Sequence, residues 1–260
     1  MNISENKSFL NKVVLITGAS TGIGLATAKA FAARGATLML AARDHQQLFE
    51  AAQVCRSLGA RCEALPTDIQ NYSQVRALVE QTVKHFGGID VLVNNAGVGQ
   101  AGLFHLQKWD DINRTLLTNL QGTLALAHAA LPQMVAQGSG IIVNVSSVIG
   151  KRAMPGLAPY CATKFALWGF SDSLRLELKP FGIHVCHFCP TTTATEFQLK
   201  AGIKLSAGAD SADKVAQALL GAVLHKKDEQ IMSFMERLLI KAHHFAPNLL
   251  NILLGYRKTL

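Results

Sequence analysis

A glycine-rich loop that follows a short apolar run is the strongest constraint on the fold of this chain. Residues 13–17 are apolar and β-branched, which is typical of a strand buried on both faces. A loop with Gly18, Gly22 and Gly24 follows directly, and a helix is expected from about Leu25 to Arg34. Glycines allow a tight turn and close backbone approach, while a helix N-terminus attracts anions. The unit predicts a turn that cradles a dinucleotide pyrophosphate.

Strand-like and helix-like segments alternate along most of the chain. Further strands are predicted at residues 37–41, 61–65, 90–93, 141–145, 183–188 and 230–234, and helices at 45–58, 72–86, 108–134 and 159–178. This alternation predicts an α/β fold, a Rossmann-like doubly wound parallel sheet of about seven strands with helices on both faces. Since no linker or repeat interrupts the pattern, residues 1–260 are expected to form a single domain.

The composition and charge of the chain exclude several classes of protein. Hydrophobic residues make up 49% of the chain and charged residues 16%, which indicates a globular protein with a large core. The net charge is +8, but no Arg/Lys cluster is interleaved with aromatic residues, so a nucleic-acid partner is not expected. Residues 1–12 lack the apolar core of a signal peptide, and no run of about 18 apolar residues suggests a transmembrane helix. With five cysteines, an odd number, the chain is expected to be cytoplasmic, with reduced thiols.

A tyrosine and a lysine lie one helical turn apart in the segment Tyr160-Cys161-Ala162-Thr163-Lys164. A free phenol has a pKa of about 10, and a nearby ammonium favours the phenolate and lowers that pKa. The pair is therefore a candidate general acid/base for proton transfer between a carbinol and a carbonyl.

The residues after the second strand bear on the choice of cofactor. In NAD-binding proteins of this architecture, a carboxylate near this strand's end holds the ribose 2′-hydroxyl, and the matching position here is Ala42. Arg43 follows, and a guanidinium suits a 2′-phosphate, which favours NADP(H). Asp44 leaves NAD(H) open, because a shift of one residue would bring an acid to the ribose.

A segment rich in histidine and cysteine, in the strand expected at residues 183–188, suggests a metal site. The segment His184-x-Cys186-His187-x-Cys189 resembles a metal-ligand set, but alternate residues of a strand point to opposite faces. The four side chains cannot converge on one ion, so no metal site is expected.

The C-terminal region, residues 235–260, is predicted to form a hydrophobic helical extension. An apolar stripe at helical spacing precedes Pro247, and a second apolar segment ends before Arg257 and Lys258. The extension can pack on the domain or on a partner subunit. Alternatively it can contact a membrane surface or cover an apolar substrate pocket.

Taken together and in this order, the motifs resemble those of the short-chain dehydrogenase/reductase family over residues 10–235. They are Thr17-Gly18-x-x-x-Gly22-Ile23-Gly24, Asp68, Asn94-Asn95-Ala96-Gly97, Asn119, Ser147 and Tyr160-x-x-x-Lys164. Ser147 precedes Tyr160 by thirteen residues, the usual family spacing, whereas Ser146 is one residue too distant.

The resemblance implies catalytic roles for four residues. Tyr160 would donate a proton in reduction and accept one in oxidation, and Lys164 would lower its pKa and hold the nicotinamide ribose. Ser147 would hydrogen-bond the substrate carbonyl. Asn119 would support a water-mediated proton relay behind Lys164.

The resemblance also implies a set of cofactor contacts, which includes Tyr160 and Lys164. The other residues expected to bind the cofactor are Gly18, Ser20, Thr21, Gly22, Ile23, Gly24, Arg43, Asp68, Ile69, Asn95, Ala96, Gly97, Pro190 and Thr195. Asp68 and Ile69 would flank the adenine. One position departs from the family pattern: Thr191 follows Pro190 where glycine is usual, which leaves the contacts near the nicotinamide carboxamide open.

These observations predict that the protein is an oxidoreductase, which transfers a hydride between NADP(H) and a lipophilic carbonyl compound or secondary alcohol. The alternatives are an NAD-dependent alcohol dehydrogenase and a membrane-peripheral or scaffold nucleotide-binding protein with little turnover. From the family, a homodimer or homotetramer is expected.

Overall fold

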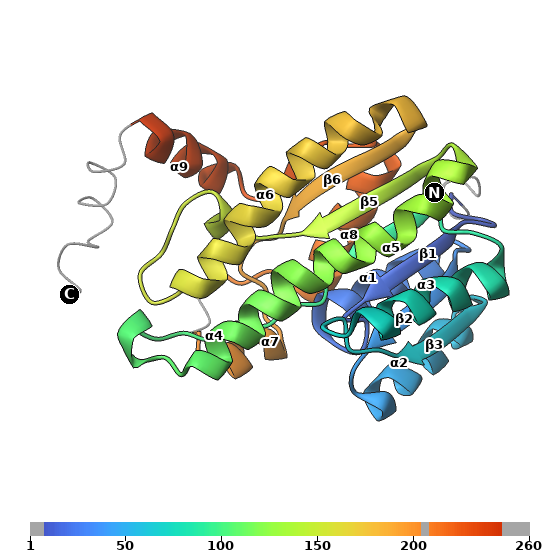
Figure 1. The fold of residues 1–260 in the computed structure, drawn as a ribbon, viewed down its shortest axis with the longest axis horizontal. Helices are drawn as coiled ribbons and strands as arrows, with labels where there is room; N and C mark the ends of the chain where they lie inside the picture. The colour runs from blue at the N-terminus through green and yellow to red at the C-terminus, as the bar shows by residue number, and fades with distance from the viewer. Residues whose placement is uncertain (1–7, 204–207, 246–260) are drawn as a thin grey trace.

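Parallel strands form one sheet in the computed structural model, which describes residues 8–203 and 208–245. Within these ranges the seven strands run in the order β3-β2-β1-β4-β5-β6-β7 (Figure 1). The strands are β1 (Val13–Thr17), β2 (Thr37–Ala42), β3 (Cys62–Pro66), β4 (Val91–Asn94), β5 (Gly140–Val145), β6 (Ile183–Cys189) and β7 (Glu229–Ile231). The predicted doubly wound parallel sheet is confirmed.

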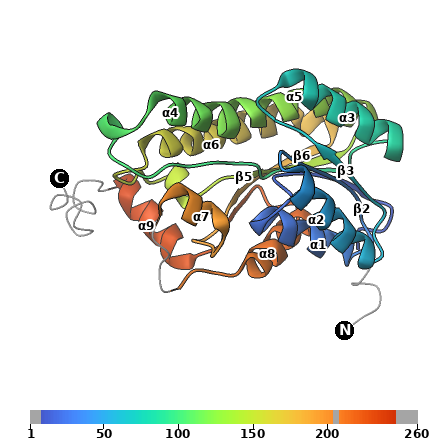
Figure 2. The same ribbon diagram turned by 90° about the horizontal axis from the view of Figure 1, so that it is seen from below.

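Helices cover both faces of the sheet and give three layers (Figure 2). One face carries α1 (Gly22–Ala32), α2 (His45–Ser57) and α8 (Ala212–Leu224). The other carries α3 (Tyr72–Phe86), α4 (Trp109–Leu116), α5 (Gly122–Gln137) and α6 (Ala158–Leu178). Two further helices are α7 (Glu196–Ala201) and α9 (Phe234–Phe245), and α9 lies at one end of the molecule in both views.

Strand β1 shows why the sheet needs helices on both sides. Val14 and Ile16 belong to the apolar core shared with α1, α2 and α8, whereas Leu15 belongs to the core shared with α3, α5 and α6. All three side chains are fully buried. A strand that is apolar at every position can be stable only between two apolar layers.

Hydrogen bonds fix helix α6 on the sheet. Asn94 donates its Nδ2–H to Asn144 Oδ1 over 2.9 Å, and Asn144 donates its own amide to Ser171 Oγ over 2.9 Å. Further along α6, Arg175 Nε donates to the carbonyl of Val185 at 2.9 Å. Because buried polar groups are costly to leave unpaired, these bonds favour one rotation and one position of α6.

The structure differs from the expected elements in two places. A π-helical segment, η3 (Leu117–Gln121), separates α4 from α5 in the helical region expected at residues 108–134. The last strand ends at Ile231 rather than at residue 234, because Phe234 already begins α9.

Only the first part of the expected C-terminal extension can be described. Helix α9 covers residues 234–245, and the second apolar segment lies outside the described residues. In α9 the apolar residues Phe234, Met235, Leu238 and Phe245 are all exposed. Among the described helices, none combines the length and hydropathy needed to cross a membrane.

Candidate active site

The glycine-rich loop joins β1 to α1 and depends on glycine at two kinds of position. Gly18 and Gly22 have positive φ angles of 62° and 55°, which side-chain-bearing residues rarely adopt. Gly24 has no such angle, but a Cβ atom on it would lie 2.0 Å from the carbonyl oxygen of Gly18. The first turn of α1 therefore packs against the loop at a distance that only glycine allows.

Backbone donors at the start of α1 are available to an anion. The side chain of Thr21, the residue before α1, makes no capping hydrogen bond, and the first turn holds no acidic residue. By contrast, Asp44 caps α2 and Asn71 caps α3 through side-chain oxygens. The first backbone N–H groups of α1 point along the helix axis and carry partial positive charge. Ser20, Thr21, Gly22, Ile23 and Gly24 thus fit the pyrophosphate of a dinucleotide.

The loop after β4 supports the glycine-rich loop from the side. Asn95 donates its side-chain amide to the carbonyls of Thr17, at 2.9 Å, and Gly18, at 3.1 Å. The backbone N–H groups of Asn95 and Ala96 donate to Thr17 Oγ1 at 3.2 Å each. The Asn95 side chain therefore holds the loop in place, a structural role beyond the cofactor contact expected of it. Thr17 belongs to the family motif, and its hydroxyl acquires a role only through this tertiary contact.

At the end of β2, the two side chains that could contact the ribose, Arg43 and Asp44, have different surroundings. Asp44 Oδ1 accepts a hydrogen bond from the backbone N–H of Gln47 at 2.9 Å, so this carboxylate caps α2. Arg43 is exposed, and no hydrogen bond or ion pair of its guanidinium is found within the described ranges. Of the two side chains, the arginine is the one available to a ligand.

After β3, the two residues expected at the adenine have different surroundings. Asp68 is half-buried, and its Oδ1 accepts a hydrogen bond from the N–H of Gln70 at 3.0 Å. Ile69 is buried, and a Cβ on Gly122 would lie 2.7 Å from its side chain. The Ile69 side chain thus packs against α5, which places it in the core rather than in an open crevice.

Tyr160, Lys164 and Ser147 are brought together between α6 and the end of β5. The Lys164 Nζ lies 5.4 Å from the centre of the Tyr160 ring and donates to the carbonyl of Val145 at 2.9 Å. Ser147 lies near enough to the Tyr160 phenol to favour its ionised form. The Ser146 hydroxyl is buried and faces the carbonyl of Lys164 instead, at 3.5 Å, which favours Ser147 as the serine of the site.

Burial shifts the proton equilibria of both α6 residues. It raises the pKa of the Tyr160 phenol, whereas Ser147 acts in the opposite direction. It lowers the pKa of Lys164 to about 8. The expected lowering of the tyrosine pKa is therefore wrong for this structure, because removal from water, with smaller contributions from Cys161 and Cys189, outweighs the opposite effect of Ser147. At neutral pH the phenol keeps its proton.

Asn119 lies in the π-helical segment η3 and joins the site to the loop after β4. Its Oδ1 accepts from the N–H of Val98 and its Nδ2 donates to the carbonyl of Val98, both at 2.8 Å. The same Nδ2 lies 3.3 Å from Thr163 Oγ1, next to Lys164 in sequence. The side chain thus connects the loop to α6. A Cβ on Gly97 would come within 3.4 Å of Asn119 Oδ1, so Gly97 permits this close contact.

The segment after β6 approaches both parts of the site. A Cβ on Gly22 would lie 3.2 Å from the Thr195 methyl group, so Thr195 lies beside the glycine-rich loop. Pro190, half-buried, begins this segment. On α7, the Phe197 ring lies 5.6 Å from the Tyr160 ring, centre to centre.

The alternation of the His/Cys segment on β6 is visible in the structure. Cys186 belongs to the core on the α1 face, while His187 and Cys189 lie together, with Nδ1 and Sγ 3.6 Å apart. Within the described residues, no three His, Cys, Asp or Glu side chains gather as a metal ion would require.

Gly24 gives a direct test of the dinucleotide cradle. We expect Gly24→Ala to weaken dinucleotide binding by more than about tenfold, because the new methyl group must displace the loop that holds the phosphates. Binding is measured by fluorescence titration. The matched control is Gly169→Ala on α6, where a Cβ would have no neighbour within 4 Å. Equal affinity of the Gly24→Ala protein and the wild type would contradict the assignment.

Comparison with known proteins agrees with this geometry. A model of the short chain dehydrogenase family matches residues 12–205. The chain is 34% identical to the ketoacyl reductase HetN of Nostoc sp., over 85% of this chain and 78% of that protein. It is 35% identical to 17-beta-hydroxysteroid dehydrogenase 13 of Rattus norvegicus, over 86% of this chain and 75% of the relative.

Solved structures are similar as well. A short chain dehydrogenase/reductase from Burkholderia phymatum, in complex with NAD, superposes with a TM-score of 0.87 at 25% identity, over 93% of this chain and 95% of that one. An NAD+-bound xylitol dehydrogenase has a TM-score of 0.77 at 28% identity, over 84% and 94% of the two chains. With the fold, the cradle and the Tyr–Lys–Ser group, these matches show that the chain belongs to the short-chain dehydrogenase/reductase family of oxidoreductases.

Proposed function

We propose that this protein is an NADP(H)-dependent reductase of carbonyl compounds, able to run in reverse on secondary alcohols. The observation that carries the proposal is the buried Tyr160 phenol, which lies beside Ser147 and one helical turn from Lys164. A scaffold protein with little turnover would not need this group intact.

The nicotinamide, when bound, supplies the hydride for the substrate carbon. Residues of the chain bind and protonate the substrate oxygen. Ser147 donates a hydrogen bond to the substrate oxygen and stabilises the charge that develops there. Tyr160 donates its phenolic proton to that oxygen in reduction and accepts it back in oxidation. The buried Lys164 ammonium lowers the cost of the phenolate that remains. The resting phenol holds its proton at neutral pH, as reduction requires, and Lys164 must offset the rise in its pKa that burial causes.

Removal of the phenolic hydroxyl tests this role. We expect Tyr160→Phe to lower kcat by at least about a thousandfold, since general acid catalysis and its hydrogen bond are both lost. The Kd for NADPH should stay within about threefold, because the ring and its packing are kept. Tyr72→Phe is the matched control, since the Tyr72 side chain is exposed and its hydroxyl is hydrogen-bonded with His128, outside the catalytic group. Turnover in Tyr160→Phe that equals the wild type would remove the mechanism.

The surroundings of Tyr160 favour a lipophilic substrate. Its ring belongs to a small apolar cluster with Ile149, Leu157 and Cys161, and Phe197 packs against it. Such a wall gives few hydrogen bonds to a polar substrate. One relative carries the name of a 17-beta-hydroxysteroid dehydrogenase, and a 17-beta-hydroxysteroid is a lipophilic secondary alcohol.

The preference for NADP(H) is supported by the contrast at the end of β2. The carboxylate of Asp44 caps α2, whereas the Arg43 guanidinium is exposed and suits a 2′-phosphate. NAD(H) is the alternative, since both solved neighbours named above hold NAD.

Arg43→Ala separates the two cofactors. We expect the variant to weaken NADPH binding by about tenfold or more and NADH binding by less than about twofold, because only NADPH carries the 2′-phosphate. Both dissociation constants are measured by nicotinamide fluorescence. Arg76→Ala serves as control, because that exposed arginine pairs with Glu80 on α3. Equal losses for both cofactors would refute the role of Arg43.

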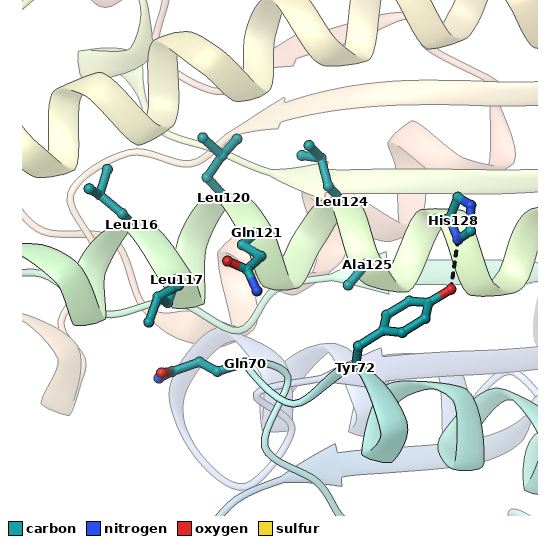
Figure 3. Close-up of a pocket in the computed structure, with 9 residues that line it drawn as sticks. All are labelled: Gln70, Tyr72, Leu116, Leu117, Leu120, Gln121, Leu124, Ala125 and His128. Carbon is teal, nitrogen blue, oxygen red and sulfur yellow. Dashed lines mark hydrogen bonds between the residues drawn. The ribbon is translucent and has the colours of Figure 1, made fainter.

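We also propose a homo-oligomer, through an apolar groove on α4, η3 and α5. The groove has a volume of about 640 Å³, and Tyr160 is not among the residues that line it (Figure 3). Its lining is formed by Gln70, Tyr72, Leu116, Leu117, Leu120, Gln121, Leu124, Ala125 and His128. Burial of these apolar side chains against a second copy of the chain would remove them from water and stabilise the assembly.

A charge in the groove tests the oligomer. We expect Leu124→Arg to lower the mass measured by light scattering to that of a smaller assembly, because a buried unpaired charge opposes association. Leu58→Arg, at an exposed leucine after α2, should leave the mass unchanged. An unchanged mass for Leu124→Arg, or a monomeric wild type, would contradict this interface.

Contact with a lipid surface is proposed for α9. Its apolar residues Phe234, Met235, Leu238 and Phe245 are exposed, and the basic residues Arg237 and Lys241 lie among them. Amphipathic helices of this composition bind the interface of anionic membranes.

Vesicle sedimentation tests this contact. We expect the full chain to sediment with phosphatidylserine vesicles, and the chain without residues 236–260 to stay in the supernatant, because the apolar contact area is lost. A Leu238→Glu variant should show a partial loss, and Leu176→Glu on α6 is its control. If the shortened chain sediments as well as the full one, the membrane contact is wrong.

A further inference from the structure

The segment between β6 and α7 runs along the edge where a dinucleotide would lie. It leaves the sheet after Cys189, and Thr195 already lies against Gly22 of the glycine-rich loop. The strand order reverses between β1 and β4, so the ligand crevice of this fold lies outside the carboxyl ends of these two strands. Residues 190–195 therefore pass from β6 to the loop after β1 and border that crevice.

Asp210, just before α8, holds this segment through its backbone. Its N–H donates to the carbonyl of Thr192 at 2.8 Å, and its carbonyl accepts from the N–H of Ala194 at 3.0 Å. These two bonds form a parallel bridge between Thr193 and Asp210. Two stretches of chain on either side of α7 are thereby joined.

The side chain of Asp210 adds a second connection. One carboxylate oxygen accepts a hydrogen bond from the Thr191 hydroxyl, and the other accepts from Lys214 Nζ at 2.6 Å. The side chain is only 16% exposed. The hydrogen bonds from Lys214 and then Thr191 lower the pKa of Asp210, so the carboxylate is ionised at neutral pH. Hydrogen bonds to a charged acceptor are the stronger kind.

This arrangement accounts for the residue that departs from the family pattern. Where glycine is usual after the proline of β6, this chain has Thr191, whose hydroxyl is bonded to Asp210. Thr193 adds to the same turn, because its hydroxyl donates to the carbonyl of Thr191 at 2.8 Å. The Thr191 side chain is therefore directed to Asp210, just before α8.

We propose that Asp210, through its bond to Thr191, is a positioning residue that holds residues 190–195 in the shape that binds the nicotinamide half of the cofactor. This inference rests on the proposed dinucleotide-dependent function and adds a residue to it. Asp210 itself lies outside the catalytic group and acts only through the segment that it orients.

Two variants act on the bond from its two ends, one by removing the charge of the acceptor and the other by removing the donor. Asp210→Asn keeps the size and the backbone bridge but loses the charge, and Thr191→Val keeps the shape but loses the hydroxyl. For each we expect the Kd for NADPH, measured by fluorescence titration, to rise about tenfold, the size typical of one charge-assisted hydrogen bond. The KM for NADPH should rise equally, with kcat changed by less than about twofold.

Matched controls separate positioning from stability. Asp213→Asn changes a neighbouring acid whose side chain is 75% exposed and lies 3.9 Å from Lys29, so its Kd should equal that of the wild type. Thr191→Ser keeps the hydroxyl and should restore binding. Thermal unfolding is recorded for every variant.

Two results would overturn the proposal. In one, Asp210→Asn and Thr191→Val lower the melting temperature but leave the Kd for NADPH unchanged, which means that the bond only stabilises the fold. In the other, Asp213→Asn weakens binding as much as Asp210→Asn. A wild-type protein that binds no nicotinamide cofactor would instead refute the proposed function, and the positioning role with it.

Discussion

Parallel pairing of the strands is the constraint on which the rest of this structure depends. Every strand of the sheet runs in the same direction, so each one needs a crossover and each leaves the sheet at the same edge. Loops that are distant in sequence therefore meet there. Asn95 after β4 and Thr195 after β6 both lie against the glycine-rich loop after β1 for this reason.

Helix α6 converts that edge into a site, and it does so at a cost in stability. Its polar anchors on β5 and β6 hold Tyr160 and Lys164 in a buried position. Burial disfavours the charged lysine, whose pKa falls to about 8, and it also disfavours the phenolate. Proton transfer from Tyr160 to a substrate oxygen therefore produces a phenolate that burial disfavours, and the nearby Lys164 ammonium offsets part of that cost.

Sequence patterns predicted the parts of the molecule that local chemistry dictates. The strands were predictable because apolar β-branched runs are stable mainly in a buried sheet. The cradle was predictable because positive φ angles and the close contact between Gly24 and Gly18 both require glycine. The partners of polar side chains were not predictable. The bond from Asn95 to Thr17, the π-helical turn at Asn119 and the tie between Asp210 and Thr191 depend on tertiary contacts. The pKa of Tyr160 was misjudged because burial cannot be read from a Tyr–Lys spacing.

The most direct test of this account is a titration of the purified protein with NADPH and, separately, with NADH, following nicotinamide fluorescence. The account predicts saturable binding of NADPH, at least about tenfold tighter than that of NADH. The opposite preference would place a carboxylate rather than Arg43 at the ribose and point to NAD-dependent alcohol oxidation. Binding of neither nucleotide would contradict the central claim that this site performs hydride transfer.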